Sequence, residues 1–283
     1  MNFSKRLFVS TSCFNINSLT NQIIEAKKIG IKNLELSINI SKQHYYNFNS
    51  IKTEKMKFLL HNYSPPPRKD FVLNLSSRDK KNLEKSINFC KKSIRLTHKL
   101  GGKFYSIHSG FSADVEPKHL GAKIPKSKVF DPKIGMEIFF KSIERLLKYA
   151  QSFNILILIE NHLVSLKNIK EQSDNALILS NPKDLLDFVS YFKNKNLGIL
   201  LDTSHAEITS KNLSFSKNLY FEYLGSNIKA LHVSRSKNNL DLNLPIKKNF
   251  WFKKYLNKNL TYILEYNYIN KKIYNESCNL LFS

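Results

Sequence analysis

The stretch Gly198-Ile-Leu-Leu-Asp202-Thr-Ser-His205 determines how the rest of this sequence is interpreted. Its apolar part, residues 197–201, has the length of a β-strand buried on both faces and is too short for a helix. The strand ends abruptly at Asp202, and His205 follows three residues later. Parallel α/β folds carry their chemistry at the carboxyl ends of their strands, so an acid and an imidazole at this point indicate a functional site.

Three further apolar stretches of strand length also end in a side chain that can bind a metal ion. They end at Glu160, His232 and Glu265. The four strand ends are separated by 42, 30 and 33 residues. Eight equal strand–helix units in a chain of 283 residues would each have about 35 residues, which is close to these intervals. The spacing therefore indicates a repeated strand–helix unit.

Hydrophobic periodicity predicts eight strands that alternate with helices. The strands are expected at residues 7–11, 33–37, 58–61, 103–108, 155–160, 197–201, 228–232 and 262–265. Helices are expected at residues 18–28, 50–56, 76–100, 138–153, 182–192, 217–224 and 248–256, with at most a short helix in the C-terminal tail. Long loops follow the fourth strand (110–133) and the fifth.

This alternation predicts an α/β fold with a parallel sheet, and eight units close such a sheet into a (β/α)8 TIM barrel. We expect one barrel domain over residues 1–283. An open, doubly wound sheet is the competing architecture. It lacks support because no Gly-x-Gly-x-x-Gly or Walker loop follows the first strand.

The composition is that of an ordinary globular protein except for its charge. Hydrophobic residues make up 42% of the chain, and the formal net charge is +23. Of the 45 basic residues 39 are lysines, whereas proteins that read nucleic acid favour arginine. We interpret the lysines as a solvated surface. The alternative is an anionic partner such as a sugar phosphate, a nucleotide-linked sugar or a nucleic-acid backbone.

The cysteines and the hydropathy pattern bear on location. Cys13, Cys90 and Cys278 are odd in number and lack metal-site spacing, which is typical of reduced cysteines in a cytoplasmic protein. The apolar patch near the N-terminus is too short for a signal sequence, and no segment approaches the roughly 20 apolar residues of a membrane span. We therefore expect a cytoplasmic protein with no membrane partner.

The four strand ends predict a metal centre. In a barrel, Glu160, Asp202, His232 and Glu265 would converge at the carboxyl-terminal mouth. Three carboxylates pointing together in a partly dry pocket repel one another, and a divalent cation relieves that repulsion. Oxygen-rich ligation with one imidazole suits one Mn²⁺, Mg²⁺ or Co²⁺ ion, and Zn²⁺ is also accepted.

Five further side chains are candidates for contact with the substrate. His205 is either a fifth metal ligand or a group that touches a substrate oxygen. His108 and His61 end the fourth and third strands, and each is weighed against a buried structural histidine. Glu35 either lines the mouth or pairs with a lysine. Arg235 either holds an anionic or hydroxylated substrate or faces solvent.

At these residues the chain resembles the xylose isomerase-like TIM-barrel superfamily, which includes sugar and sugar-phosphate isomerases and epimerases and the endonuclease IV-type apurinic nucleases. The motifs that carry the resemblance span nearly the whole chain. They are Leu-Glu35-Leu, His61-Asn, His108-Ser-Gly, Ile-Glu160-Asn, Leu-Asp202-Thr-Ser-His205, His232-Val-Ser and Leu-Glu265. These motifs distinguish the superfamily from other protein families, but they do not distinguish its isomerase, epimerase and nuclease branches from one another.

The epimerase branch implies that Glu160, Asp202, His232 and Glu265 hold one divalent metal that polarises a ketose carbonyl and hydroxyl. Glu160 and Glu265 would be the catalytic residues on opposite sides of the substrate. One would remove a carbon-bound proton and the other would return it through an enediolate. The segments Asn62-Tyr-Ser-Pro-Pro-Pro and Phe71-Val-Leu-Asn-Leu resemble a branch associated with surface-polysaccharide synthesis.

The nuclease branch implies a DNA repair endonuclease with three zinc ions, to which His108 and His205 and an Asp-x-His element would contribute. Here that element is Asp241-Leu-Asn243, with asparagine in place of histidine. This difference weakens the support for a third metal ion and so for the nuclease interpretation. A barrel that only binds a carbohydrate is a third hypothesis, and it does not need the two opposed carboxylates.

The expected partner is accordingly a small-molecule sugar or sugar phosphate. Nucleic acid is expected only under the nuclease alternative, and a homo-oligomer is left open.

Overall fold

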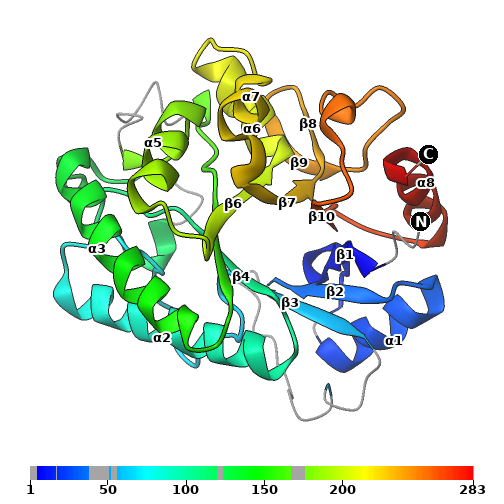
Figure 1. The fold of residues 1–283 in the computed structure, drawn as a ribbon, viewed down its shortest axis with the longest axis horizontal. Helices are drawn as coiled ribbons and strands as arrows, with labels where there is room; N and C mark the ends of the chain where they lie inside the picture. Colours follow the sequence, from blue (N-terminus) through cyan, green and yellow to red (C-terminus); the bar gives the residue numbers. More distant parts are fainter. Residues whose placement is uncertain are drawn as a thin grey trace.

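The computed structural model describes residues 5–16, 18–37, 51, 56–119, 124–166 and 176–282. Eight parallel strands form a closed barrel in the order β1-β10-β7-β6-β5-β4-β3-β2 (Figure 1). The barrel strands are β1 (Leu7–Ser10), β2 (Asn33–Leu36), β3 (Lys57–His61), β4 (Phe104–His108), β5 (Leu156–Glu160), β6 (Leu197–Asp202), β7 (Ile228–Val233) and β10 (Thr261–Leu264). The predicted single-domain (β/α)8 TIM barrel is confirmed.

Helices surround the barrel and follow most of its strands (Figure 1). The α-helices are α1 (Leu19–Ile29), α2 (Lys80–Lys99), α3 (Pro132–Gln151), α5 (Pro182–Phe192), α6 (Thr203–Asn212), α7 (Leu219–Leu224) and α8 (Lys271–Phe282). Short 3₁₀ helices lie at η2 (Thr11–Cys13), η4 (Pro117–His119), η5 (Lys126–Lys128), η7 (Gly225–Asn227) and η8 (Lys253–Tyr255). Within the described residues, no helix combines the length and apolar character that crossing a membrane requires.

Local side-chain chemistry sets the helix ends. The helix expected from residue 76 begins at Lys80, because Asp79 caps α2 and its side chain accepts a hydrogen bond from the Lys81 N–H. Asn181 caps α5 in the same way, and Pro182 occupies its first turn. Gly30 ends α1 with φ of +96°, a left-handed conformation that glycine adopts without a Cβ penalty.

Four element predictions differ from the structure. No α-helix forms at 248–256, where the structure has only the short helix η8, because three consecutive aromatics, Phe250 to Phe252, all pack against the core and one helical face cannot hold them. The unpredicted helix α6 starts directly after β6, and an unpredicted two-stranded ribbon, β8 (Arg235–Lys237) and β9 (Leu240–Leu244), follows β7. The C-terminal helix α8 has 12 residues and is longer than expected.

Other predictions concern segments that the structure describes only in part, or a helix whose first residue differs. Only Ile51 and Met56 of the helix expected at 50–56 belong to the described residues. Residues 120–123 of the loop after β4 and 167–175 of the loop after β5 also lie outside them. The helix expected to start at 138 starts earlier, because Asp131 caps it and Pro132 occupies its first turn.

The interior of the barrel is filled by one apolar side chain from each of seven strands. These are Phe8, Leu59, Phe104, Leu158, Leu200, Ala230 and Ile263. They form a cluster separate from the larger apolar layer between the barrel and its helices. Because side chains along a strand alternate between its two faces, the residue two positions further on also points into the barrel. The apolar layer is therefore the floor on which the next layer of inward-facing side chains lies.

Removing one side chain from this floor should destabilise the protein. Leu200 is fully buried, so Leu200→Ala should lower the free energy of unfolding by about 2–5 kcal/mol. Ile24 on α1 is 47% exposed, and Ile24→Ala is the matched control, expected to change stability by less than about 1 kcal/mol. Urea denaturation of both variants measures the difference. Equal effects would contradict a close-packed barrel interior.

Candidate metal centre

The predicted metal ligands lie one layer above the apolar floor. Glu160, Asp202 and His232 are the last or next-to-last residues of β5, β6 and β7, and Glu265 directly follows β10. Each comes two residues after a floor residue of its own strand, so all four side chains point inward at the carboxyl end of the barrel. The four strands are consecutive neighbours in the sheet, in the order β10-β7-β6-β5. The structure therefore brings the four predicted residues together.

The imidazole of His232 is at the centre of this group. Its Nδ1 lies 3.0 Å from Glu265 Oε2, 3.4 Å from Glu160 Oε1 and 3.7 Å from Asp202 Oδ2. One ligand atom from each of the four side chains can be chosen so that all lie within 4.8 Å of one another. This is the spacing of atoms that could coordinate one ion.

Several atoms of the group are buried without a hydrogen-bond partner. They are Glu160 Oε2, Asp202 Oδ2 and His232 Nδ1, three of seven such side-chain atoms among the described residues. The other four belong to neutral side chains. A buried polar atom that makes no hydrogen bond is costly even where an oppositely charged group lies nearby, so three in one cluster need an explanation. A divalent cation fits, because it would satisfy all three atoms at once.

Glu35 lies on the other side of the His232 ring. Both its carboxylate oxygens lie near His232 Nε2, at 3.0 and 3.2 Å, and both side chains are fully buried. A hydrogen bond from Nε2–H to Glu35 leaves Nδ1 as the lone-pair atom that faces the three carboxylates. This is the arrangement in which a carboxylate orients a metal-binding histidine. The position of Glu35 supports a role behind His232 and not a direct substrate contact.

Without a cation, the pKa values of Asp202 and His232 shift in the direction that favours bound protons and so reduces the negative charge of the cluster. Burial raises the pKa of Asp202 to about 7, with Glu160 and Glu265 adding to the rise. Burial disfavours the imidazolium of His232, but Glu265, Glu35 and Glu160 together hold its pKa well above the usual value. In the metal-free protein, a proton on His232 thus supplies part of the positive charge that a cation would provide.

A second group of ligand atoms surrounds the same glutamate. His61 Nε2 and His108 Nε2 each lie 3.4 Å from Glu160 Oε2. His61 is buried and its Nδ1 lies 3.1 Å from Ser106 Oγ, whereas the His108 side chain is 36% exposed. Burial lowers the pKa of both histidines, that of His61 to about 3, which keeps the rings in the neutral form that binds metals.

His205 lies beside the cluster on the first turn of α6. Asp202 positions it, because Asp202 Oδ1 accepts a 2.7 Å hydrogen bond from the His205 N–H and caps the helix. The ring Nδ1 donates to the Asn161 carbonyl over 3.1 Å and lies 3.5 Å from Glu160 Oε1. The remaining nitrogen, Nε2, lies 3.4 Å from Asp241 Oδ2 on β9. His205 thus faces the cluster at one nitrogen and an additional carboxylate at the other.

Two further residues lie near the site. The sequence analysis names Asp241 only as part of the element that the nuclease alternative implies, and it does not name His162 as a site residue. Asp241 reaches His205 because the ribbon β8–β9 folds back over α6, and Ser204 Oγ donates to it over 2.6 Å. His162, which the sequence places in a loop, has its ring centroid 5.8 Å from that of His108. Arg235 lies on β8, where its Nε donates to the Pro245 carbonyl and holds the ribbon.

Fold and site together define a (β/α)8 barrel with a carboxylate–imidazole cluster at its mouth that could hold a metal ion. The family model described as xylose isomerase-like TIM barrel matches residues 24–280. The chain therefore belongs to the xylose isomerase-like TIM-barrel family, as its motifs predict. A comparison of the sequence with curated proteins finds no match.

Solved structures share this fold over the full chain at low identity. A D-tagatose 3-epimerase-like protein is 17% identical, with 98% of each chain covered and a TM-score of 0.71. An L-ribulose 3-epimerase is 12% identical, with 96% of this chain and 86% of the other covered and a TM-score of 0.65. The IOLI protein with a binding zinc atom is also 12% identical, with 97% and 96% covered and a TM-score of 0.65.

Loss of one ligand charge should remove metal-induced stabilisation. A divalent ion at about 100 times its dissociation constant stabilises a folded protein by about 2.7 kcal/mol, so Mn²⁺ should raise Tm. Asp202→Asn keeps a side-chain oxygen that can cap α6 but removes the charge, and it should abolish most of the Tm rise. Glu276→Gln on exposed α8 is the control and should keep the full rise. An unchanged Tm rise in Asp202→Asn would contradict the site.

Metal binding should weaken as pH falls below about 7. A carboxyl group of Asp202 with a pKa of about 7 holds a proton in the metal-free protein below that pH, and the proton must leave when the metal enters. Calorimetric titration with Mn²⁺ should show a Kd that rises by roughly tenfold per unit below about pH 7. A Kd that is constant down to about pH 5 would contradict ligation by Asp202.

Proposed function

We propose that this chain is a metal-dependent isomerase or epimerase that acts on a sugar or sugar phosphate by proton transfer at carbon. The observation that carries the proposal is the pair Glu160 and Glu265 in one cluster, in which Glu160 is buried and Glu265 is half-buried. Their strands β5 and β10 lie three places apart in a ring of eight, so the two carboxylates approach the mouth from nearly opposite sides. Two opposed carboxylates suit removal of a proton on one side of a carbon and its return on the other.

The residues fit one divalent ion, with Glu160, Asp202, His232 and Glu265 as its ligands. When bound, the ion would polarise a carbonyl and an adjacent hydroxyl and so make the carbon-bound proton more acidic. His232 is held in position by Glu35. His205 and the partly exposed His108 lie where they can contact substrate oxygens, and we assign them to substrate binding.

The proton transfer depends on the state of the two glutamates. One must be a carboxylate to accept the carbon-bound proton, and the other must carry a proton to give back. Burial raises and His232 lowers the pKa of Glu265, and the balance keeps it below the usual value. The pKa of Glu160 is also held low, because His108, His232 and His61 outweigh its burial. Both groups are therefore available as bases. The glutamate that accepts the carbon-bound proton becomes an acid on that side of the carbon. For return on the opposite side, the other glutamate must first take up a proton from solvent, and the first then loses its proton to solvent.

The similar solved structures and other features of the chain support this proposal. Sugar epimerases are among those structures. The proline-rich loop after β3 resembles proteins of surface-polysaccharide synthesis, and we propose that pathway class as the setting. Cys13, Cys90 and Cys278 are all free thiols, which supports a cytoplasmic location.

A repair endonuclease is the second candidate, and a specific observation favours it. His61, His108 and Glu160 form a second group that could hold an ion, with Glu160 shared between the two groups. The third ion of such an enzyme is less well supported, because Asn243 stands where the nuclease motif has histidine. Ser234 Oγ donates to the Asn243 side-chain oxygen over 3.4 Å.

Solvent exchange tests the proposed function. The metal-loaded protein, incubated with ketoses and ketose phosphates in D₂O, should place deuterium on the carbon next to the carbonyl. Glu265→Gln should slow this exchange by roughly 10²–10⁴-fold, because a general base is lost. The exposed-site variant Glu276→Gln should exchange at the normal rate. Normal exchange in Glu265→Gln would contradict the two-glutamate scheme.

Metal content and abasic DNA separate the two candidates. One bound ion per chain and no cleavage of abasic-site DNA are expected for the isomerase or epimerase. Three zinc ions with cleavage at moderate salt would reverse the ranking.

A further inference from the structure

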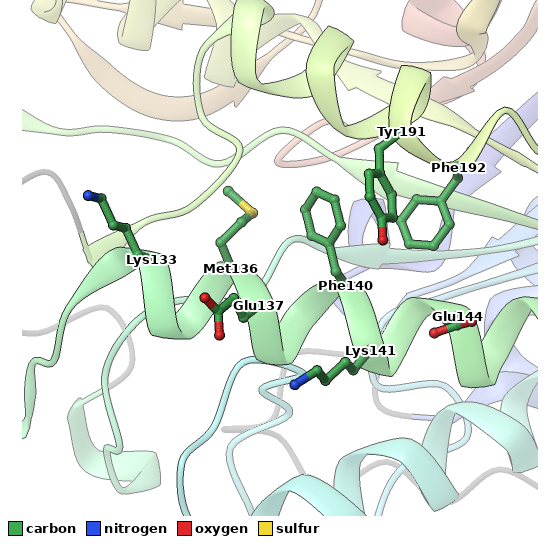
Figure 2. Close-up of a pocket in the computed structure, with 8 residues that line it drawn as sticks. All are labelled: Lys133, Met136, Glu137, Phe140, Lys141, Glu144, Tyr191 and Phe192. Atoms are coloured by element: carbon green, nitrogen blue, oxygen red, sulfur yellow. The ribbon is translucent and has the colours of Figure 1, made fainter.

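The outer wall of the barrel carries an apolar groove between α3 and α5, with a volume of about 550 Å³ (Figure 2). Met136 and Phe140 of α3 face Tyr191 and Phe192 of α5 across it. The Phe140 ring centroid lies 4.7 Å from that of Tyr191 and 5.5 Å from that of Phe192. Tyr191 is nonetheless 70% exposed. An exposed apolar groove with polar borders is typical of a contact surface.

The border on α3 consists of four charged side chains: Lys133, Glu137, Lys141 and Glu144. Their spacing of four, four and three residues places them in one stripe along the helix. The four are surface residues, and none forms an ion pair with another described residue. They lie beside the aromatic side chains, so a partner that covers the groove must also meet these charges (Figure 2).

The order of the charges identifies that partner. From the N-terminal end of α3 the signs are plus, minus, plus, minus, and read from the other end each sign is reversed. A second copy with its α3 antiparallel would set Lys133 opposite the partner subunit's Glu144, and Glu137 opposite the partner subunit's Lys141. The two-fold axis would cross α3 close to residue 139. Symmetry forms each pair twice, whereas a parallel arrangement would set like charges together.

The net charge of the chain favours this surface over others as a contact between two copies. Two copies with a net charge of +23 repel each other, but the stripe is itself neutral, so close approach costs less here than over an average part of the surface. Packing of Tyr191 and Phe140 against the second copy would supply the apolar contribution. We propose that this groove is the interface of a two-fold symmetric homodimer in which the α3 helices lie antiparallel. It contains no residue of the metal centre and does not depend on the proposed function.

Charge reversal tests the pairing directly. Lys141→Glu would face the partner's Glu137 twice in each dimer, and it should raise the dimer Kd by more than roughly tenfold. The double variant Glu137→Lys/Lys141→Glu again sets opposite charges against each other in both 137–141 pairs and should return the Kd to within about threefold of the wild type. Lys271→Glu on α8, which lies across the barrel from α3 (Figure 1), is the matched control and should leave the Kd unchanged.

Sedimentation velocity at about 0.15 M salt is the measurement, because this salt screens the long-range repulsion but not pairs in contact. Far-UV circular dichroism and the Tm of each variant without added metal show that it is folded. A dimer that dissociates in Lys141→Glu and recovers in the double variant supports the proposal. A wild type that stays monomeric at about 100 µM overturns it, as does a Kd that Lys141→Glu leaves unchanged or that the double variant does not restore.

Discussion

Three carboxylates converge on one imidazole nitrogen, and much of the architecture follows from the need to balance their charge. Glu160 and Asp202 are buried, and Glu265 is half-buried. Glu160, Asp202 and Glu265 all lie within 3.7 Å of His232 Nδ1. In this low-dielectric position their mutual repulsion is large, and only a cation or bound protons can relieve it. Glu35 holds the other face of the ring, so His232 cannot turn away from the three charges. The cluster therefore lowers the stability of the metal-free protein, and a bound cation would offset that loss.

The barrel explains why the charges lie together at all. An apolar side chain from each of seven strands closes its interior, and the polar residues lie two positions further along their strands. The floor keeps water out from below, which strengthens the electrostatic interactions above it. The helices and loops contribute less to this geometry, although α6 is tied to it because Asp202 is both a cluster member and the cap of that helix.

The sequence predicts the barrel and the four central residues because both depend on local patterns. Each strand has a strong apolar signal that ends in a ligand residue, as with Leu-Leu-Asp202. The position of Glu35 behind His232 could not be predicted, because it depends on two strands 197 residues apart meeting inside the barrel. The contact of Asp241 with His205 could not be predicted for a similar reason, since the sequence names Asp241 only under the nuclease alternative. The pair Asn238 and Asn239, both with positive φ, is a turn signal that could have indicated the ribbon carrying it.

Anomalous diffraction from crystals grown with Mn²⁺ tests the central claim most directly. The map should show one strong peak per chain within bonding distance of Glu160, Asp202, His232 and Glu265, at about 2.0–2.3 Å from each ligand atom. A map with its strongest peak between His61 and His108, or with none beside His232, would contradict the proposal that these four strand ends form the primary metal centre.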